Sequence, residues 1–280
     1  MSERLGVTKT YKLLIGGKFP RSESGRVIPV GAGPDAYVCH ASRKDLRDAV
    51  EAARKALPAW AGATSYLRGQ ILYRLAEMME GKRAELSAAL AAPDADAELD
   101  RAIDRVVHYA GWCDKHPQVL GCANPVAGPY HNFTVPEPVG VVGVLCPDEP
   151  SILGLISMLA PVLASGSCAV LLASETRPVA PCVLAEALAT SDLPAGVVNI
   201  LTGQRDELTP HFASHHEIDA IHAAGVSDEQ ARLLREGAAE NLKRVTLRED
   251  VDYLDDRACE DPWWIEPFLE MKTIWHPSAT

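Results

Sequence analysis

The chain has 280 residues, of which 47% are hydrophobic and 23% charged, a composition typical of a folded globular protein with a sizeable core. A formal net charge of -11 opposes binding to phosphate backbones and anionic lipids, and the basic residues form no run, so nucleic acids and membrane surfaces are poor candidates for a partner. We expect a soluble protein of the cytoplasm.

The cysteines and the apolar stretches agree with that expectation. Seven cysteines occur without a C-x-x-C pair, and their odd number argues against a disulfide framework. The start, Met-Ser-Glu-Arg, leads into no apolar signal-peptide core. The longest apolar stretch, residues 152–163, is too short to cross a bilayer and contains Pro161. We therefore expect reduced thiols, no leader and no membrane span.

Turn and helix signals fill the amino-terminal part. Gly16 and Gly17 lie between β-favouring residues in YKLLIGGKF, residues 11–19, which predicts a two-residue hairpin turn. Ser42 is suited to cap a helix with one apolar face, and Pro58 is expected to end that helix. Further along, the pattern predicts a helix over residues 65–90, a solvated acidic loop over 92–99 and a helix over 100–112.

The pattern changes at residue 139. VGVVGVLC, residues 139–146, is a continuous apolar run that suits a strand buried on both faces of a parallel sheet. The segments that follow alternate between apolar strands at 168–172, 197–201, 218–222 and 244–247 and helices at 151–164, 179–190, 207–214 and 228–240. This alternation predicts an α/β fold with a doubly wound parallel sheet.

Two segments flank this sheet in the sequence. Residues 124–135 are rich in turn residues and then become extended. Residues 248–262 are acidic and are expected to form a loop, whereas MKTIW, residues 271–275, alternates in the manner of a strand.

Taken together and in order, several segments resemble the aldehyde dehydrogenases, which use NAD or NADP. The segments that carry the resemblance are YKLLIGGKF (11–19), ASRKDLRDAVEAARKALPAW (41–60), YAGWCDK (109–115), EPVGVVGVLCP (137–147), DLPAGVVNILTG (192–203), NLKRVTL (241–247) and FLEMKTIWHP (268–277). They span most of this chain but only about half of a family member. The resemblance therefore implies a truncated member with a Rossmann-like cofactor-type sheet.

The resemblance also implies a domain organisation with a small β oligomerisation arm. The expected parts are the hairpin and helices (1–123), the arm strands (124–138), the βα units (139–247), and an acidic linker with the last arm strand (248–280). In the family, the arm adds to the catalytic-domain sheet of another subunit. The residues expected at such an interface are Phe133, Met271, Thr273, Ile274 and Trp275.

The catalytic groups of the family have no counterpart at the matching positions. After NLKRVTL the family continues into a general-base Glu, and then into a catalytic domain with the nucleophilic Cys. Here that position is Arg248, which cannot accept a proton, and residues 248–267 lead directly to the last strand. Pro147 is followed by Asp148 and Glu149 where the family has Trp and the oxyanion-binding Asn. We expect no catalytic residue and no catalytic domain.

One cysteine remains to be considered, because Cys259 is the only cysteine of the tail. Acidic neighbours, including Asp255, Asp256 and Glu260, raise the pKa of a thiol and disfavour the thiolate. Cys259 is therefore interpreted as a surface thiol rather than as a nucleophile.

The resemblance implies a degenerate cofactor site. The family's ribose-binding Lys is Leu172 here, while its Glu is kept as Glu175, with Ser174 beside it. In the pyrophosphate turn Gly225 is kept, but Val226 replaces Ser and Gln230 replaces the second Gly. The candidate cofactor-binding residues are Glu175, Ser174, Pro147, Gly225 and Arg205. Arg205 can be interpreted as a phosphate partner or as a surface arginine.

Because Asp148 and Glu149 would face the phosphates, no cofactor is expected, with weak NAD binding as the alternative. The leading hypothesis is a pseudoenzyme subunit that hetero-oligomerises through its arm with a full-length active aldehyde dehydrogenase. One alternative is an NAD(P)-dependent aldehyde oxidoreductase component that is active only inside a complex. Another is a nucleotide-binding module built from Arg205, Glu175, His215 and His216, in which no metal site is expected. The arm is alternatively covered by the chain's own tail.

Overall fold

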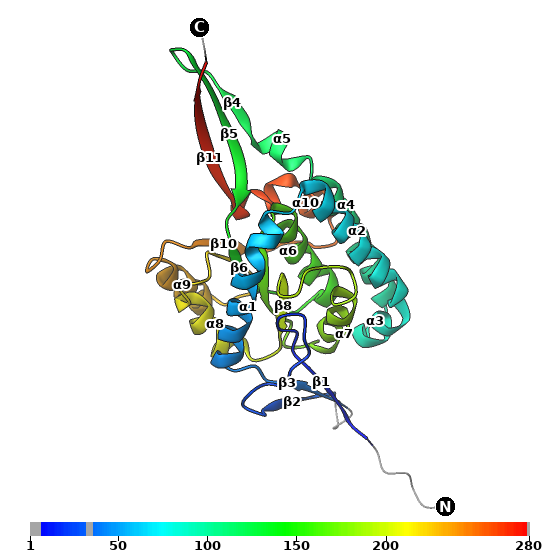
Figure 1. The fold of residues 1–280 in the computed structure, drawn as a ribbon. Helices are drawn as coiled ribbons and strands as arrows, with labels where there is room; N and C mark the ends of the chain where they lie inside the picture. Colours follow the sequence, from blue (N-terminus) through cyan, green and yellow to red (C-terminus); the bar gives the residue numbers. More distant parts are fainter. Residues whose placement is uncertain (1–6, 32–35, 279–280) are drawn as a thin grey trace, which may run out of the picture.

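A computed structural model describes residues 7–31 and 36–278 of the chain (Figure 1). The prediction that the chain starts without an apolar signal-peptide core concerns residues 1–6, which lie outside the described residues. Within them, no helix is both long and apolar enough to cross a membrane.

A five-stranded sheet with the strand order β10-β9-β6-β7-β8 forms the centre of the protein. Every neighbouring pair of strands is parallel, which confirms the predicted α/β fold. The strands are β6 (Val141–Leu145), β7 (Cys168–Leu172), β8 (Val198–Leu201), β9 (Ala220–Ala224) and β10 (Arg244–Arg248). All residues of β6, β7 and β9 are buried, as expected for strands covered on both faces.

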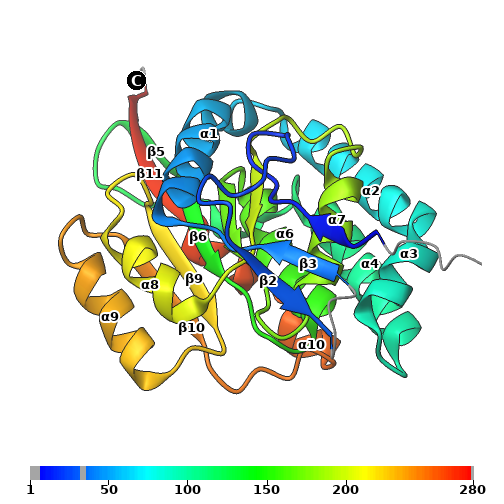
Figure 2. The same cartoon turned by 90° about the horizontal axis from the view of Figure 1, so that it is seen from below.

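Helices cover both faces of this sheet (Figure 2). The helices between the strands are α6 (Ser151–Ser165), α7 (Val179–Leu188), α8 (Arg205–Ser214) and α9 (Asp228–Ala238). The chain runs outward from β6 to β7 and β8 and then returns to β9 on the other side of β6. The loops after β6 and β9 therefore diverge at the carboxyl edge, which is where doubly wound sheets bind ligands.

The amino-terminal helices pack beside the sheet as α1 (Arg43–Ala61), α2 (Ser65–Gly81), α3 (Arg83–Leu90) and α4 (Ala95–Trp112). Ser42 and Asp45 form a capping box at the start of α1, which confirms the predicted cap. The prediction that Pro58 ends this helix is wrong. The carbonyl of Pro58 accepts a hydrogen bond from Gly62 N at 3.1 Å, and Trp60 beyond it is fully buried. Burial of the indole outweighs the loss of one backbone donor.

Two further helix boundaries differ from the prediction. The helix predicted over residues 65–90 is two helices, because the chain is interrupted at Lys82. The acidic loop predicted over residues 92–99 is wrong in its second half, since α4 begins at Ala95. Asp96 and Glu98 lie in the first turn of α4, where carboxylates stabilise the positive end of the helix dipole.

A small sheet with the order β1-β3-β2 lies at the amino-terminal end and is formed by β1 (Lys9–Tyr11), β2 (Val27–Val30) and β3 (Ala36–Cys39). Between β1 and β2, Ile15 and Lys18 exchange two backbone hydrogen bonds of 3.0 Å. Gly16 and Gly17 take φ values of 60° and 72°, which residues other than glycine rarely adopt. The predicted two-residue turn is confirmed.

The arm projects from the body as a three-stranded antiparallel sheet with the order β11-β5-β4 (Figure 1). It consists of β4 (Cys122–Asn124), β5 (Tyr130–Pro138) and β11 (Leu269–Pro277), and α5 (His116–Leu120) leads into it. Each residue of β11 has a partner on β5. The predicted strand at residues 271–275 is confirmed and is longer than predicted.

The tail connects β10 to the arm. Its elements are α10 (Asp256–Cys259) and the two 3-10 turns η1 (Pro262–Trp264) and η2 (Glu266–Phe268). The prediction of a loop over residues 248–262 is therefore wrong for the residues that form α10. In the part of the chain that the structure describes, no second large sheet follows β10.

Candidate functional site

Arg205 fills the crevice between the carboxyl ends of β6 and β9. Its side chain is only 5% exposed. Nη2 donates a hydrogen bond to the Cys146 carbonyl at 2.7 Å, and Nη1 donates to the Gly225 carbonyl. These carbonyls directly follow the two strands, so the guanidinium joins the two loops that diverge there. The interpretation of Arg205 as a surface arginine is wrong.

Gly225 and Pro147 form the walls around this guanidinium. Gly225 has a φ of +61°, and a Cβ added to it would lie 3.4 Å from Arg205 Nη1 and 3.6 Å from Pro147 Cα. The backbone thus comes close to the guanidinium from both loops. Gly225, which the resemblance places in the pyrophosphate turn, leaves room here for a side chain of the protein itself.

Carboxylates of the chain occupy the amino-terminal ends of two helices at this edge of the sheet. Glu175 Oε1 accepts a hydrogen bond from Arg205 N at 2.9 Å, at the start of α8. Glu98 Oε1 accepts from Ile152 N at 2.7 Å and Leu153 N at 3.1 Å, at the start of α6. Free N–H groups at a helix start bind anions, and these groups are already satisfied.

The start of α9, where the resemblance places the pyrophosphate, is closed by a capping box. Ser227 Oγ accepts from Gln230 N at 3.2 Å, and Gln230 Oε1 accepts from Ser227 N at 3.0 Å. Gln230 Nε2 also donates to Asp206 Oδ1 at 2.6 Å. The side chain that replaces the family's second glycine therefore satisfies the Ser227 N–H, and Ser227 satisfies the Gln230 N–H, so both are withdrawn from binding a phosphate.

The structure brings all five predicted cofactor-binding residues to this crevice, but their polar atoms bind one another. Ser174 is 1% exposed, and its Oγ donates to the Asp148 carbonyl at 3.0 Å. Asp148 Oδ1 accepts from Glu175 N at 2.7 Å and lies 3.6 Å from Arg205 Nη2. Arg205 and Gln230 thus use their polar atoms within the protein, at the turns where the resemblance places a dinucleotide's phosphates, and these residues do not fit such a ligand.

His215 and His216 lie elsewhere. They follow the carboxyl-terminal end of α8, whereas Arg205 begins it, and they line a separate hollow with Arg43 and Arg47. A ten-residue helix separates its ends by about 15 Å. The structure therefore does not bring these histidines to Arg205 and Glu175. Among the described residues, no group of three or more potential ligands is arranged for a metal ion.

Five of the seven cysteines lie in surroundings that disfavour nucleophilic attack. Burial raises the pKa to about 12 for the thiols of Cys113, Cys146, Cys168 and Cys182. Cys259 is 0% exposed, so its interpretation as a surface thiol is wrong. Its pKa is raised, chiefly by burial and to a lesser degree by Asp255 and Asp252, while Arg105 opposes that shift. A thiolate is disfavoured at these five positions.

Arg248, at the position of the family's base, anchors the tail. Its guanidinium carbon lies 3.9 Å from the centroid of the Trp264 ring, and its Nε donates to His222 Nε2 at 3.1 Å. His222 Nδ1 in turn donates to the Met158 carbonyl at 3.0 Å. The side chain at this position holds the tail against β9 instead of accepting a proton.

Burial, and secondarily Arg248, lowers the pKa of His222 well below its usual value of 6.5. Below pH 6.5 the unfolded chain binds this proton and the folded chain does not, so stability decreases as the pH falls through that value. His222→Asn removes the titrating group. We expect the variant's free energy of unfolding to depend less steeply on pH between 5 and 6.5, by up to about 1.4 kcal/mol per pH unit. Urea unfolding at several pH values measures this slope, and parallel curves would contradict the assignment.

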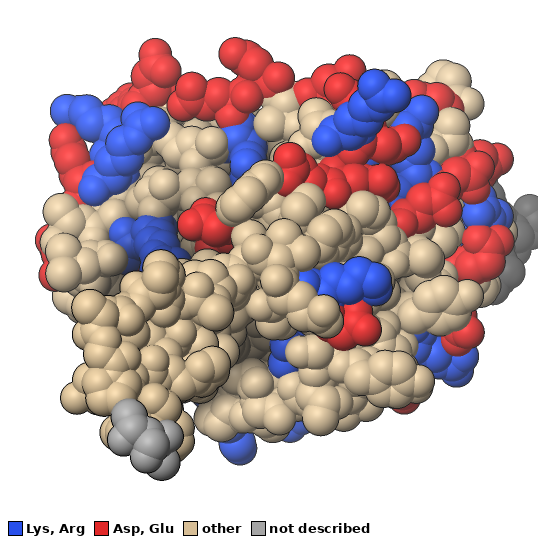
Figure 3. Space-filling view, turned by 90° about the horizontal axis from the view of Figure 1, so that it is seen from above, with Lys and Arg blue, Asp and Glu red and all other residues tan. Residues whose placement is uncertain are grey.

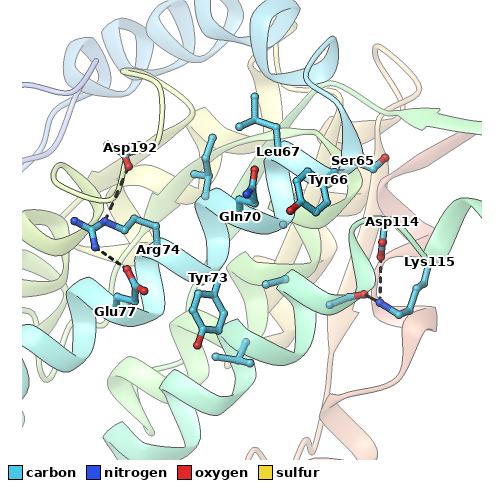
Figure 4. A pocket seen from close by; sticks show the side chains of 15 residues that line it. Ser65, Tyr66, Leu67, Gln70, Tyr73, Arg74, Glu77, Asp114, Lys115 and Asp192 are labelled. Carbon is cyan, nitrogen blue, oxygen red and sulfur yellow. Dashed lines mark hydrogen bonds and ion pairs between the residues drawn. The ribbon is translucent and has the colours of Figure 1, made fainter.

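A groove of about 910 Å³ lies between α2 and α4 on the outside of the body (Figure 4). Tyr66 and Tyr73 line it and are 69% and 53% exposed. Its arginine, Arg74, donates to Glu77 at 2.6 Å, and Figure 4 shows the side chain held between that residue and Asp192. The groove is an open, largely apolar surface, and its charged groups are already paired.

Sequence reasoning missed the polar residues that hold the tail and the helix starts. Arg105 is 0% exposed and donates to Ser157 Oγ at 2.6 Å and Asp256 Oδ1 at 2.9 Å. A signal was present, because Arg105 follows the apolar spacing of α4, between Ala102 and Tyr109. A charged residue on a buried helix face needs a specific partner.

Residues 22–249 match the model of the Aldehyde dehydrogenase family. The chain belongs to the aldehyde dehydrogenase family. It is 35% identical over 254 residues to human Retinal dehydrogenase 2, and this match covers 85% of the chain and 48% of that protein. It is 31% identical over 250 residues to Benzaldehyde dehydrogenase, mitochondrial, of Antirrhinum majus, with 84% and 46% covered.

A solved structure gives the same result for the fold. The aldehyde dehydrogenase of Bacillus cereus in complex with NAD+ superposes with a TM-score of 0.80 at 30% identity. The alignment covers 86% of this chain and 51% of that one. The chain spans about half the length of the relatives it matches.

Proposed function

We propose that this chain is a non-catalytic aldehyde dehydrogenase-like subunit that hetero-oligomerises through its β arm with a full-length, active aldehyde dehydrogenase. The observation that carries the proposal is the combination of a complete arm with a ligand crevice filled by the protein's own side chains. Arg248 and Glu149 stand where the family has its base and its oxyanion-binding Asn, so catalysis by the isolated chain is not expected.

The open edge of β11 supports association through the arm. Among the strands of residues 7–31 and 36–278, β11 is the outer strand of the sheet and pairs with β5 only, so its other side presents backbone groups without a strand partner there. Trp275, Met271 and Tyr130 are 58%, 42% and 46% exposed on this arm. An edge strand with exposed apolar side chains is suited to strand addition by a partner sheet.

The distribution of charge also supports this surface. Residues 116–136 contain no Asp, Glu, Lys or Arg, although the chain carries a net charge of -11. Figure 3 shows the arm and the surface beside it almost free of charged side chains, which gather on the other side of the same view. Depletion of charge is a property of the cores of protein interfaces.

The two alternative functions differ from the proposed one in requiring a nucleotide to bind in the crevice. A component active only inside a complex, or a nucleotide-binding module, requires Arg205 and Gln230 to move and admit a nucleotide. Family relatives include an enzyme solved with NAD+, so isothermal titration with NAD is the discriminating measurement. The proposal expects no heat of binding at millimolar NAD. The compartment we propose is the cytoplasm, because all seven cysteines are free.

The test is co-purification from the native cell, with the complex sized by light scattering. We expect an aldehyde dehydrogenase at fixed stoichiometry with the wild-type chain, and at least about tenfold less with Trp275→Lys, because a charge is placed in an apolar interface. Tyr73→Lys is the matched control, since Tyr73 is 53% exposed but lies on α2 away from the arm (Figure 1). A stable monomer or homo-oligomer without such an enzyme would overturn the proposal.

A further inference from the structure

We infer that Arg205 is an internal ligand: its guanidinium occupies the crevice of the sheet and holds it closed, so that the fold is complete without a cofactor. This inference concerns the crevice and does not depend on the arm. It also predicts that, once Arg205 is truncated, the crevice binds a planar cation and not a nucleotide.

The hydrogen bonds of the guanidinium support the inference that Arg205 holds the crevice closed. Cys146 is fully buried, and its carbonyl accepts from Arg205 Nη2 at 2.7 Å. The Gly225 carbonyl accepts from Nη1. The buried Cys146 carbonyl would be destabilising without a partner, and the planar fork of donors reaches the Gly225 carbonyl of the second loop at the same time. Arg205 therefore joins the two loops at the switch point of the sheet, the place where doubly wound sheets bind external ligands.

The charges around the guanidinium support the inference that the crevice accepts a cation and not a nucleotide. The guanidinium is almost fully buried, and a buried charge needs an opposite charge close by. Asp148 Oδ1 lies 3.6 Å from Nη2 and is held in place by Glu175 N and Ser174 Oγ. The carboxylate that would repel a pyrophosphate thus stabilises the arginine. Arg205, Asp148 and Glu175 act as one unit.

The emptied crevice would then keep two carbonyl acceptors and a carboxylate. Such a donor-free site binds a cation and repels phosphate. Truncating Arg205 should therefore create a site for the free guanidinium ion and should not restore binding of NAD. A crevice that was merely blocked sterically would behave in the opposite way.

The experiment is thermal unfolding of the wild type, Arg205→Gly and Arg205→Lys. We expect the Tm of Arg205→Gly to fall by roughly 6–15 °C, because a buried, paired charge is removed. Millimolar guanidinium chloride should restore part of this loss, whereas sodium chloride and urea at the same concentration should not. Arg205→Lys keeps the charge but offers a single donor centre, so it should be intermediate and should gain nothing from guanidinium.

Three results would overturn the inference. They are a wild-type Tm that rises with millimolar NAD, an Arg205→Gly Tm equal to the wild type, and stabilisation of Arg205→Gly by NAD but not by guanidinium. Should the glycine variant fail to fold, the wild type with NAD and the lysine variant still decide the question. Co-purification of the folded lysine variant separates this result from the arm proposal, because its arm is unchanged.

Discussion

Replacing Trp264 with alanine is expected to lower the free energy of unfolding by about 3–5 kcal/mol. The indole is 5% exposed, stacks on the guanidinium of Arg248 at 3.9 Å and lies with its ring centroid 5.9 Å from that of His222. Its Nε1 donates to the Ala258 carbonyl at 2.8 Å. The substitution removes packing, a hydrogen bond and a cation–π contact from the place where the tail meets the sheet.

The neighbouring residue provides the control. Trp263 is 61% exposed, so Trp263→Ala is expected to change the free energy of unfolding by less than about 1 kcal/mol. Urea unfolding followed by far-UV circular dichroism measures both variants. Equal losses for the two would contradict the conclusion that Trp264 anchors the tail.

The second large effect is expected at Arg105. Arg105→Ala should lower the free energy of unfolding by about 3 kcal/mol, because it opens a cavity and leaves buried acceptors unpaired. The guanidinium is fully buried and reaches Ser157 on α6 and Asp256 on α10, at 2.6 and 2.9 Å. It also donates to the Tyr253 carbonyl at 3.3 Å. One side chain thus connects two helices of the body to the tail.

Arg101 is a matched control, because it binds the same carboxylate from the surface. Its side chain is 41% exposed and pairs with Asp256 Oδ2 at 2.7 Å. An exposed ion pair contributes less than about 1 kcal/mol, so Arg101→Ala should have a small effect. Arg105→Met separates packing from hydrogen bonding, since it refills the space without the donors. A Met variant as stable as the wild type would show that the hydrogen bonds contribute no net stability.

These two anchors explain how the tail can cover the body. The resemblance implies that, in full-length members of the family, the strand equivalent to β10 leads into a catalytic domain. In this chain it leads into α10 and two short turns, and Trp264, Ile265 and Phe268 are buried against the body. The buried residues of the tail extend the core of the body. The tail also leads into β11, which pairs with β5 in the arm.

The sequence by itself determined the elements whose signals are local. The buried strands β6 and β7 follow from continuous apolar runs, the turn at Gly16 and Gly17 from backbone freedom, and the start of α1 from Ser42. The order of strands and helices along the chain then restricts the topology to a doubly wound sheet. Each of these features depends on residues that are neighbours in the sequence.

The tertiary structure alone decided what the polar residues bind. Pro58 looks like a helix end until the burial of Trp60 is known. Arg205 looks like a surface residue, yet it is placed between loops from two strands, and Glu98 caps a helix that begins more than fifty residues later. The partner of a buried charge is set by the distance between segments that are remote in the sequence. Local pattern cannot give that distance, because it arises only when the sheet has assembled.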